Sequence, residues 1–65
     1  MKPYQERVVV EKAELDTKRD NLIAFIGGAQ YRALDRAEQV RLCRQLDAMK
    51  LYSGILLERI AAFPR

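Results

Sequence analysis

Polar and aromatic side chains gather near both ends of this sequence, in segments whose spacing otherwise predicts two long helices. They are Tyr4, Arg7, Glu11 and Lys18 near the start, and Tyr52, Ser53 and Arg59 near the end. Cationic groups bind anions, aromatic rings offer stacking surfaces, and carboxylate and hydroxyl oxygens form directional hydrogen bonds. Polar groups that face a packed seam cost free energy unless partners satisfy them. These residues therefore indicate a ligand-binding pocket or a subunit contact.

Catalysis is not expected from this set of residue types. The chain has no histidine, so the usual general base near neutral pH is missing. Cys43 lies beside Leu42 and Leu46 on a predicted apolar stripe, which favours a small buried hydrophobe over a nucleophile. With one cysteine and no histidine there is also no pattern for a metal site, and we expect no enzyme activity and no cofactor.

The length bounds the fold, because 65 residues form one small domain whose core is marginal without disulfides, metal or association. A single cysteine excludes an intramolecular disulfide, so oligomerisation is the expected source of stability. No apolar run is long enough to span a bilayer, and charged residues follow Met1 and Tyr4 where a signal segment would be apolar. We therefore expect a cytosolic protein without membrane contact.

The first helix is expected over residues 3–26. Pro3 suits its first turn, and the pair Gly27-Gly28 ends it. A seven-residue repeat places Val8, Leu15 and Leu22 in one row. The neighbouring row, which is predicted to complete the apolar stripe, consists of Tyr4, Glu11, Lys18 and Phe25.

A connection over residues 27–34 and a second helix over residues 36–62 are expected next. Tyr31 and Leu34 are predicted to cover the end of the core, and Asp35 followed by Glu38 resembles a capping box. The apolar stripe of the second helix comprises Leu42, Met49, Leu56 and Phe63, with Leu46, Ser53 and Ile60 beside them.

The predicted fold is all-α: one domain over residues 1–65, formed by an antiparallel helical hairpin. With the turn centred near residue 30, the hairpin places Glu11 opposite Tyr52 and Ser53. Apolar residues off the stripes favour assembly into a helical-bundle homo-oligomer, a dimer or tetramer. Gly54 in mid-helix costs about 1 kcal/mol relative to Ala. It either admits another chain or ligand, or allows a bend.

An ordered set of residues along nearly the whole chain resembles a known family. These residues are Tyr4, Gln5, Arg7, Val8, Glu11, Lys12, Glu14, Leu15, Lys18, Leu22, Phe25, Ile26, Tyr31, Leu34, Glu38, Gln39, Arg41, Leu42, Gln45, Leu46, Met49, Tyr52, Ser53, Ile55, Leu56, Glu58, Arg59 and Ile60. They resemble the short crAss-phage-related helical proteins of tailed bacteriophages, of the Sequestin type. The chain departs from that pattern at Val9-Val10, where more polar residues are expected, and at the pair Gly27-Gly28.

The resemblance implies a phage anti-defence sponge. Such a protein binds a cyclic nucleotide messenger of host immunity, of the cyclic oligonucleotide or cyclic ADP-ribose type, and sequesters it without cleavage. It acts in the cytoplasm of the infected bacterial host, against systems such as CBASS or Thoeris. In this hypothesis Arg7 and Arg59 bind phosphate, Tyr4 and Tyr52 stack on bases, Glu11 and Ser53 bond to base or ribose, and Lys12 or Lys18 adds charge from a neighbouring subunit.

Each of these residues also has a simpler explanation. Arg7 and Glu11 are spaced as an i,i+4 surface ion pair, and tyrosines often sit at the edge of a core. Arg59 suits the end of its helix or Glu58 of a neighbouring chain, and Ser53 is placed to bond back to the carbonyl of Met49.

A basic patch supports an alternative function. The net charge of +3 arises in residues 27–65, with seven basic and four acidic groups. The patch comprises Arg32, Arg36, Arg41 and Arg44. A helical interaction protein could dock on a host or phage macromolecule, or on nucleic acid, through these arginines. Acidic neighbours dilute the patch and no recognition-helix motif is present, so nucleic acid is not the expected partner, and a solvated face is the favoured interpretation of these arginines.

Overall fold

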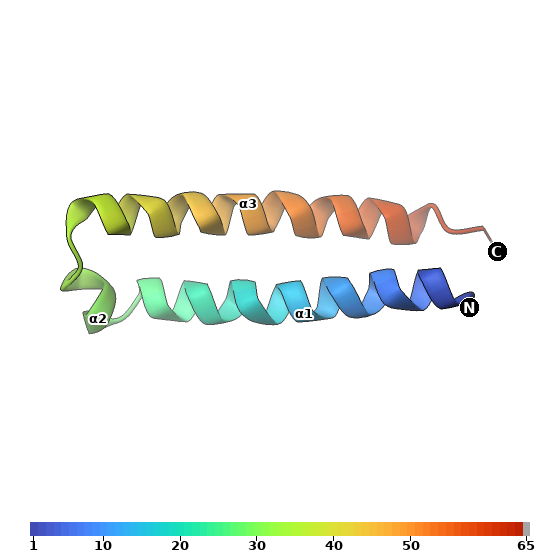
Figure 1. Cartoon of the computed structure of the whole chain (residues 1–65), viewed down its shortest axis with the longest axis horizontal. Coiled ribbons are helices and arrows are strands. Elements are labelled where there is room, and N and C mark those ends of the chain that lie inside the picture. Colours follow the sequence, from blue (N-terminus) through green and yellow to red (C-terminus); the bar gives the residue numbers. More distant parts are fainter. Residues whose placement is uncertain (65) are drawn as a thin grey trace.

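Residues 1–64 are described by a computed structural model, which is a helical hairpin. The helices are α1 (Pro3–Ile26), α2 (Ala29–Arg32) and α3 (Arg36–Ala61). The two long helices run antiparallel, with both termini at one end and α2 at the other (Figure 1). Residues 1–64 contain no strand, so the prediction of an all-α fold with a long helix pair is confirmed. None of the described helices is long and apolar enough to cross a membrane.

Local side-chain contacts fix the helix ends. Before α1, the backbone N–H of Lys2 donates to Oε1 of Gln5 over 2.8 Å, and α1 ends where Gly28 begins a new turn. An added Cβ at Gly28 would lie 3.3 Å from the carbonyl oxygen of Phe25, and this close approach favours glycine. At the start of α3, the backbone N–H of Glu38 donates to Oδ1 of Asp35 over 2.8 Å, which confirms the predicted cap.

The seam between α1 and α3 uses one predicted row of α1 and part of the other. Val8, Leu15 and Leu22 face α3 as predicted. The predicted second row holds only in part, because Glu11 and Phe25 are half-buried but Tyr4 and Lys18 are exposed. The other side of the seam holds Gln5, Lys12, Arg19 and Ile26, which are buried or half-buried. Long cationic side chains can line a seam with their methylene stems while their charged heads reach polar partners at its edge.

The register of the two helices also differs from the predicted one. Ser53 contacts Asp16, and the ring of Phe63 packs edge-on against Tyr4 with 6.0 Å between centroids. Relative to the prediction that Ser53 faces Glu11, this moves α3 by about five residues, which is about one and a half helical turns. The cause is α2, which carries the chain past the end of α1 before α3 begins (Figure 1). Tyr31 of α2 is held there by the side-chain amide of Gln39, which donates to its carbonyl over 2.9 Å.

One chain buries only a small core. Val8, Leu15 and Leu56 are buried, and Met49, Ile60 and Phe63 pack against them. The prediction that Cys43 is buried was wrong: its thiol is exposed and lies 3.2 Å from the hydroxyl of Tyr31. Position 43 follows the seam residue Leu42 and therefore points past the seam toward α2. Most of the large apolar residues off the two stripes remain on the surface of the hairpin.

Candidate functional site

A hydrogen-bonded centre on one side of the seam joins the two long helices. The carboxylate of Asp16 accepts from Nζ of Lys12 over 2.6 Å, from Nη1 of Arg19 over 3.1 Å and from Oγ of Ser53 over 2.5 Å. The bond from Lys12, and then that from Ser53, hold the pKa of Asp16 below its ordinary value. We call this the Asp16 network. Its cations are bound within the chain, so its first role is to fix the pairing of α1 with α3.

Sequence reasoning missed Asp16 as a functional centre. A local signal existed, because Lys12 and Arg19 lie four residues before and three residues after it, the spacings at which helical side chains meet. The partner from α3 had no such signal, since Ser53 reaches Asp16 only in the observed register. Ser53 is buried, and its hydroxyl does not bond back to Met49 but donates to Asp16.

The other six predicted site residues lie along the opposite side of the seam. On α1 they adjoin the row of Val8 and Leu15, and on α3 they adjoin the row of Leu56 and Phe63. The ring contact between Tyr4 and Phe63 shows that these two rows share a side. We call this set the polar flank: Tyr4, Arg7, Glu11, Lys18, Tyr52 and Arg59.

Side chains of the polar flank are mostly open to solvent. The two tyrosines are 44% and 43% exposed, and Arg7, Lys18 and Arg59 are exposed as well. Within residues 1–64 none of these three cations forms an ion pair, so the i,i+4 bridge from Arg7 to Glu11 is not made. The flank thus presents two aromatic rings and three cations whose charges are not used inside the described chain.

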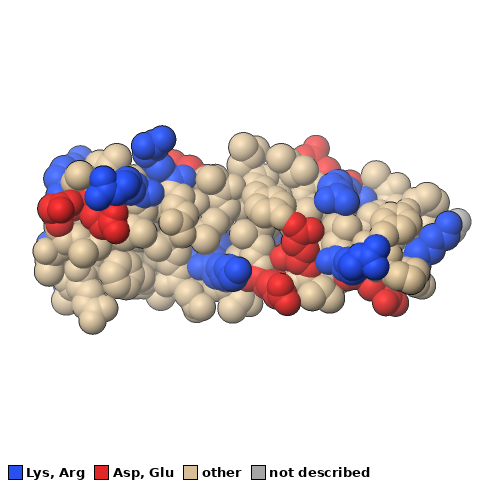
Figure 2. All heavy atoms as spheres, viewed as in Figure 1, with Lys and Arg blue, Asp and Glu red and all other residues tan. Residues whose placement is uncertain are grey.

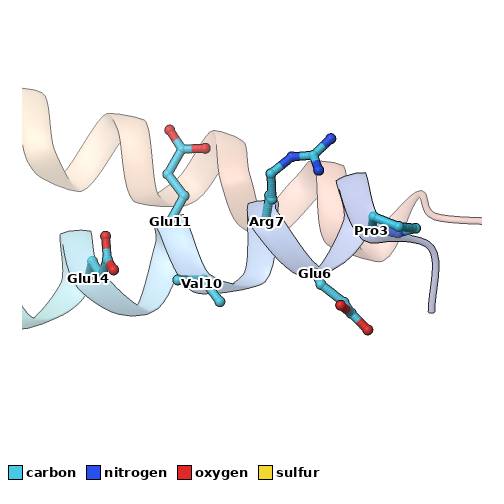
Figure 3. A pocket seen from close by; sticks show the side chains of 6 residues that line it. All are labelled: Pro3, Glu6, Arg7, Val10, Glu11 and Glu14. Atoms are coloured by element: carbon cyan, nitrogen blue, oxygen red, sulfur yellow. The ribbon is translucent and has the colours of Figure 1, made fainter.

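An open depression of about 550 Å³ borders the polar flank along α1. Figure 3 shows Arg7 and Glu11 rising from the same side of the helix, with Glu6 directed away from them. The lining residues all belong to α1: Pro3, Glu6, Arg7, Val10, Glu11 and Glu14. Three carboxylates and one guanidinium make the depression unsuitable for a phosphate by itself. An anion bound here needs further cations, from the rest of the flank or from another chain.

The predicted basic patch lies at the closed end of the hairpin, around α2 and the start of α3. Its arginines are exposed, and Arg41 pairs with Glu38 over 2.8 Å. A small cavity of about 210 Å³ includes Arg36, Arg44, Tyr31 and Cys43 but also Asp47. The hydrogen bond with the thiol of Cys43 raises the pKa of Tyr31. Blue and red spheres are interspersed along the visible face in Figure 2, so charge of one sign does not dominate it.

Residues 1–64 contain no group of three or more side chains placed to hold a metal ion. The groups that the surface offers are cations, rings and hydrogen-bonding oxygens along the polar flank, and a second set of cations at the closed end.

Comparison with known proteins gives one match. No curated protein and no solved structure matches the chain. The model of the Sequestin family matches residues 2–62, which is nearly the whole chain and confirms the resemblance found in the residues. The family suggests a sequestering function, with binding and not catalysis as the role of the protein. The chain belongs to the Sequestin family.

Proposed function

We propose that this protein sequesters a cyclic nucleotide messenger of bacterial immunity and thereby acts as a phage anti-defence sponge. The ligand is of the cyclic oligonucleotide or cyclic ADP-ribose type, and it is held without cleavage in the cytoplasm of the infected host. One observation carries the proposal: the polar flank places exposed rings and unpaired cations on one side of a chain from a sequestering family. Phosphates and bases need these two kinds of group.

Each group on the flank has a role in this proposal. Arg7 and Arg59 bind phosphate oxygens, since a guanidinium offers paired donors in a fixed plane. Tyr4 and Tyr52 stack on the bases, and Glu11 accepts hydrogen bonds from base or ribose. Lys12 and Ser53 are assigned to positioning, because both already bind Asp16.

The length of the flank supports a ligand shared between subunits. Tyr4 and Lys18 are about 21 Å apart along α1, at 1.5 Å per residue. One compact cyclic nucleotide therefore does not contact both ends of the flank in a single chain. In a homo-oligomer, a dimer or tetramer, Lys18 of one subunit supplies charge to a ligand held by Arg7 and Arg59 of another. The same contact offsets the carboxylates of the α1 depression.

Isothermal titration calorimetry tests the proposal. The protein is titrated with cyclic dinucleotides, cyclic trinucleotides and cyclic ADP-ribose isomers, together with the Arg7→Ala and Arg59→Ala variants. Arg41→Ala is the matched control, since it removes an exposed arginine from the basic patch. We expect one ligand class to bind, to be recovered unchanged after heat denaturation, and to lose affinity only in the two flank variants. The absence of measurable binding to every ligand of the panel would contradict the proposal.

A second candidate function is docking on a host or phage macromolecule through the basic patch. The observation that favours it is the small cavity at the closed end, where Arg36 and Arg44 lie beside Tyr31. Replacing both Arg41 and Arg44 by Glu reverses the charge of this end. That double variant is expected to lose a docking partner and to keep nucleotide binding, whereas Arg7→Ala has the opposite pattern.

A further inference from the structure

The surface area of the chain exceeds that of a compact monomer of its mass. The hairpin exposes 5000 Å² and has a mass of 7.5 kDa. The usual scaling of surface with mass gives about 4,250 Å² for a folded monomer of that size. The excess of about 750 Å² is close to the roughly 800 Å² that each partner buries in a standard protein interface. The area therefore fits a second copy of this chain on one face of the hairpin.

One face of α3 carries the most exposed aliphatic side chains of the two long helices. Leu51 is 68% exposed and Leu57 is 57% exposed. They lie three residues before and three residues after Gly54, so the three positions form one stripe along the helix. Apolar groups this open to water are typical of an interaction site when they cluster.

No contact among the described residues requires glycine at position 54. It lies inside α3, which continues without interruption from Arg36 to Ala61, so it marks no helix end. A Cβ added to it would meet nothing within 4 Å among residues 1–64, so no described neighbour forbids a side chain. Glycine weakens a helix relative to alanine. Because no contact within the described chain explains glycine at position 54, the residue fits a site where the backbone of another chain approaches closely.

Charge is arranged symmetrically about the same glycine. Lys50 and Glu58 lie four residues before and four residues after Gly54, on a second row that crosses the leucine stripe at Gly54, and both are exposed. Within residues 1–64 neither of them forms an ion pair. In a two-fold antiparallel crossing at Gly54 that aligns the i±4 ridges of the two helices, each residue on the ridge meets the one at the same distance on the other side of the axis. Lys50 then faces Glu58 of the partner subunit. Leu51 and Leu57 lie on either side of this ridge, where each packs beside the same leucine of the partner subunit.

We propose that Gly54 marks the two-fold axis of a homodimer in which the α3 helices of two copies cross antiparallel. A two-fold interface requires one patch to be complementary to itself, and the series Lys50, Leu51, Gly54, Leu57 and Glu58 has that property. The dimer packs two hairpins as a four-helix assembly.

This dimer face is separate from the polar flank. Gly54 is two residues after Tyr52 and five before Arg59, which turns it about 140–160° away from both around the helix axis. The flank therefore stays open in the dimer, and a ligand shared between the flanks of two subunits requires a second interface, as in a tetramer. The dimer proposal does not rest on the ligand proposal, and either one can fail while the other holds.

Sedimentation equilibrium of the full chain tests the dimer. We expect the wild type to be dimeric, and Gly54→Gln to weaken the dimer by about tenfold or more because its side chain separates the two backbones. The monomer should keep its fold, since a side chain at position 54 meets open space. Val40→Gln is the matched control: Val40 is exposed on α3 but lies beyond the reach of the crossing. It should leave the dimer unchanged.

A charge exchange identifies the register of the crossing. Lys50→Glu sets like charges against each other across the axis and should weaken the dimer, and adding Glu58→Lys should restore it. Circular dichroism of each variant checks that the helices persist. A wild type that stays monomeric at its highest soluble concentration overturns the proposal. So does a dimer that tolerates Gly54→Gln, or one that the double exchange fails to restore.

Discussion

The two sides of the hairpin seam carry similar residue types and use them in opposite ways. In the Asp16 network, Lys12 and Arg19 pair with the carboxylate of Asp16 at 2.6 and 3.1 Å, and Arg19 also pairs with Asp20. On the polar flank, Arg7 and Arg59 have no ion-pair partner among residues 1–64. A charge that is already paired contributes to the fold, and a charge that is left unpaired beside exposed rings is available to a ligand. The comparison separates positioning cations from candidate binding cations.

The largest effect expected from this comparison concerns ligand affinity. Arg7→Ala should weaken nucleotide binding by about 2 kcal/mol or more, which is about thirtyfold, because a charge-assisted contact to phosphate is lost. Its melting temperature should stay near that of the wild type, since Arg7 is exposed and pairs with no residue of the described chain. Calorimetry and thermal unfolding measure the two quantities.

Arg19→Ala is the matched control for that variant. It removes a guanidinium from the Asp16 network and should lower the melting temperature while leaving affinity unchanged at temperatures where the protein is folded. If Arg19→Ala costs more affinity than Arg7→Ala, the division between the two sides of the seam is wrong.

A smaller effect is expected from the link between the helices. Ser53→Ala removes the hydroxyl that donates to Asp16 and should lower the free energy of unfolding by about 1 kcal/mol. Chemical denaturation at fixed protein concentration measures the change, because an oligomer gains stability with concentration. Ser53→Thr keeps a hydroxyl at the same position and serves as the control. A loss of nucleotide binding in Ser53→Ala without a loss of stability would instead place Ser53 in the ligand site.

Sequence periodicity predicted the helices well because local signals decide them. The cap at Asp35 and the apolar stripe from Leu42 to Phe63 each depend on residues that lie close together in the sequence, so a short window of sequence predicts them. The register of the two long helices depends on where α2 places the start of α3. The geometry of the connection sets this position, and no repeat in the sequence reveals it. The α1 seam was mispredicted for a related reason: Lys12 and Arg19 look unsuitable for a seam until Asp16 is seen to accept from both. The contacts between the two helices therefore could not be predicted from the periodicity of each helix alone.

Acid is expected to weaken one side of the seam selectively. The bonds from Lys12 and Ser53 hold the pKa of Asp16 below its ordinary value of 3.8. The unfolded chain therefore takes up a proton at this group before the folded chain does. Its contribution to stability is complete above pH 3.8 and is lost as the pH falls from there through the lower pKa of the folded state. Asp16→Asn should remove this part of the pH dependence, measured by thermal unfolding at a series of acidic pH values.

The smallest effect is expected at the basic patch, where a charge is paired and still exposed to water. Arg41 binds Glu38 over 2.8 Å, but 61% of the arginine side chain is open to solvent. Exposed ion pairs of this kind contribute up to about 0.5 kcal/mol, so Arg41→Ala should change the unfolding free energy by no more than that. It should also leave nucleotide affinity unchanged. The cations of the chain then fall into three kinds: those paired at the seam, those paired but open to water, and those left unpaired beside aromatic rings. A marked loss of affinity in Arg41→Ala would show that the ligand binds at the closed end, near Arg36 and Arg44, and not along the flank.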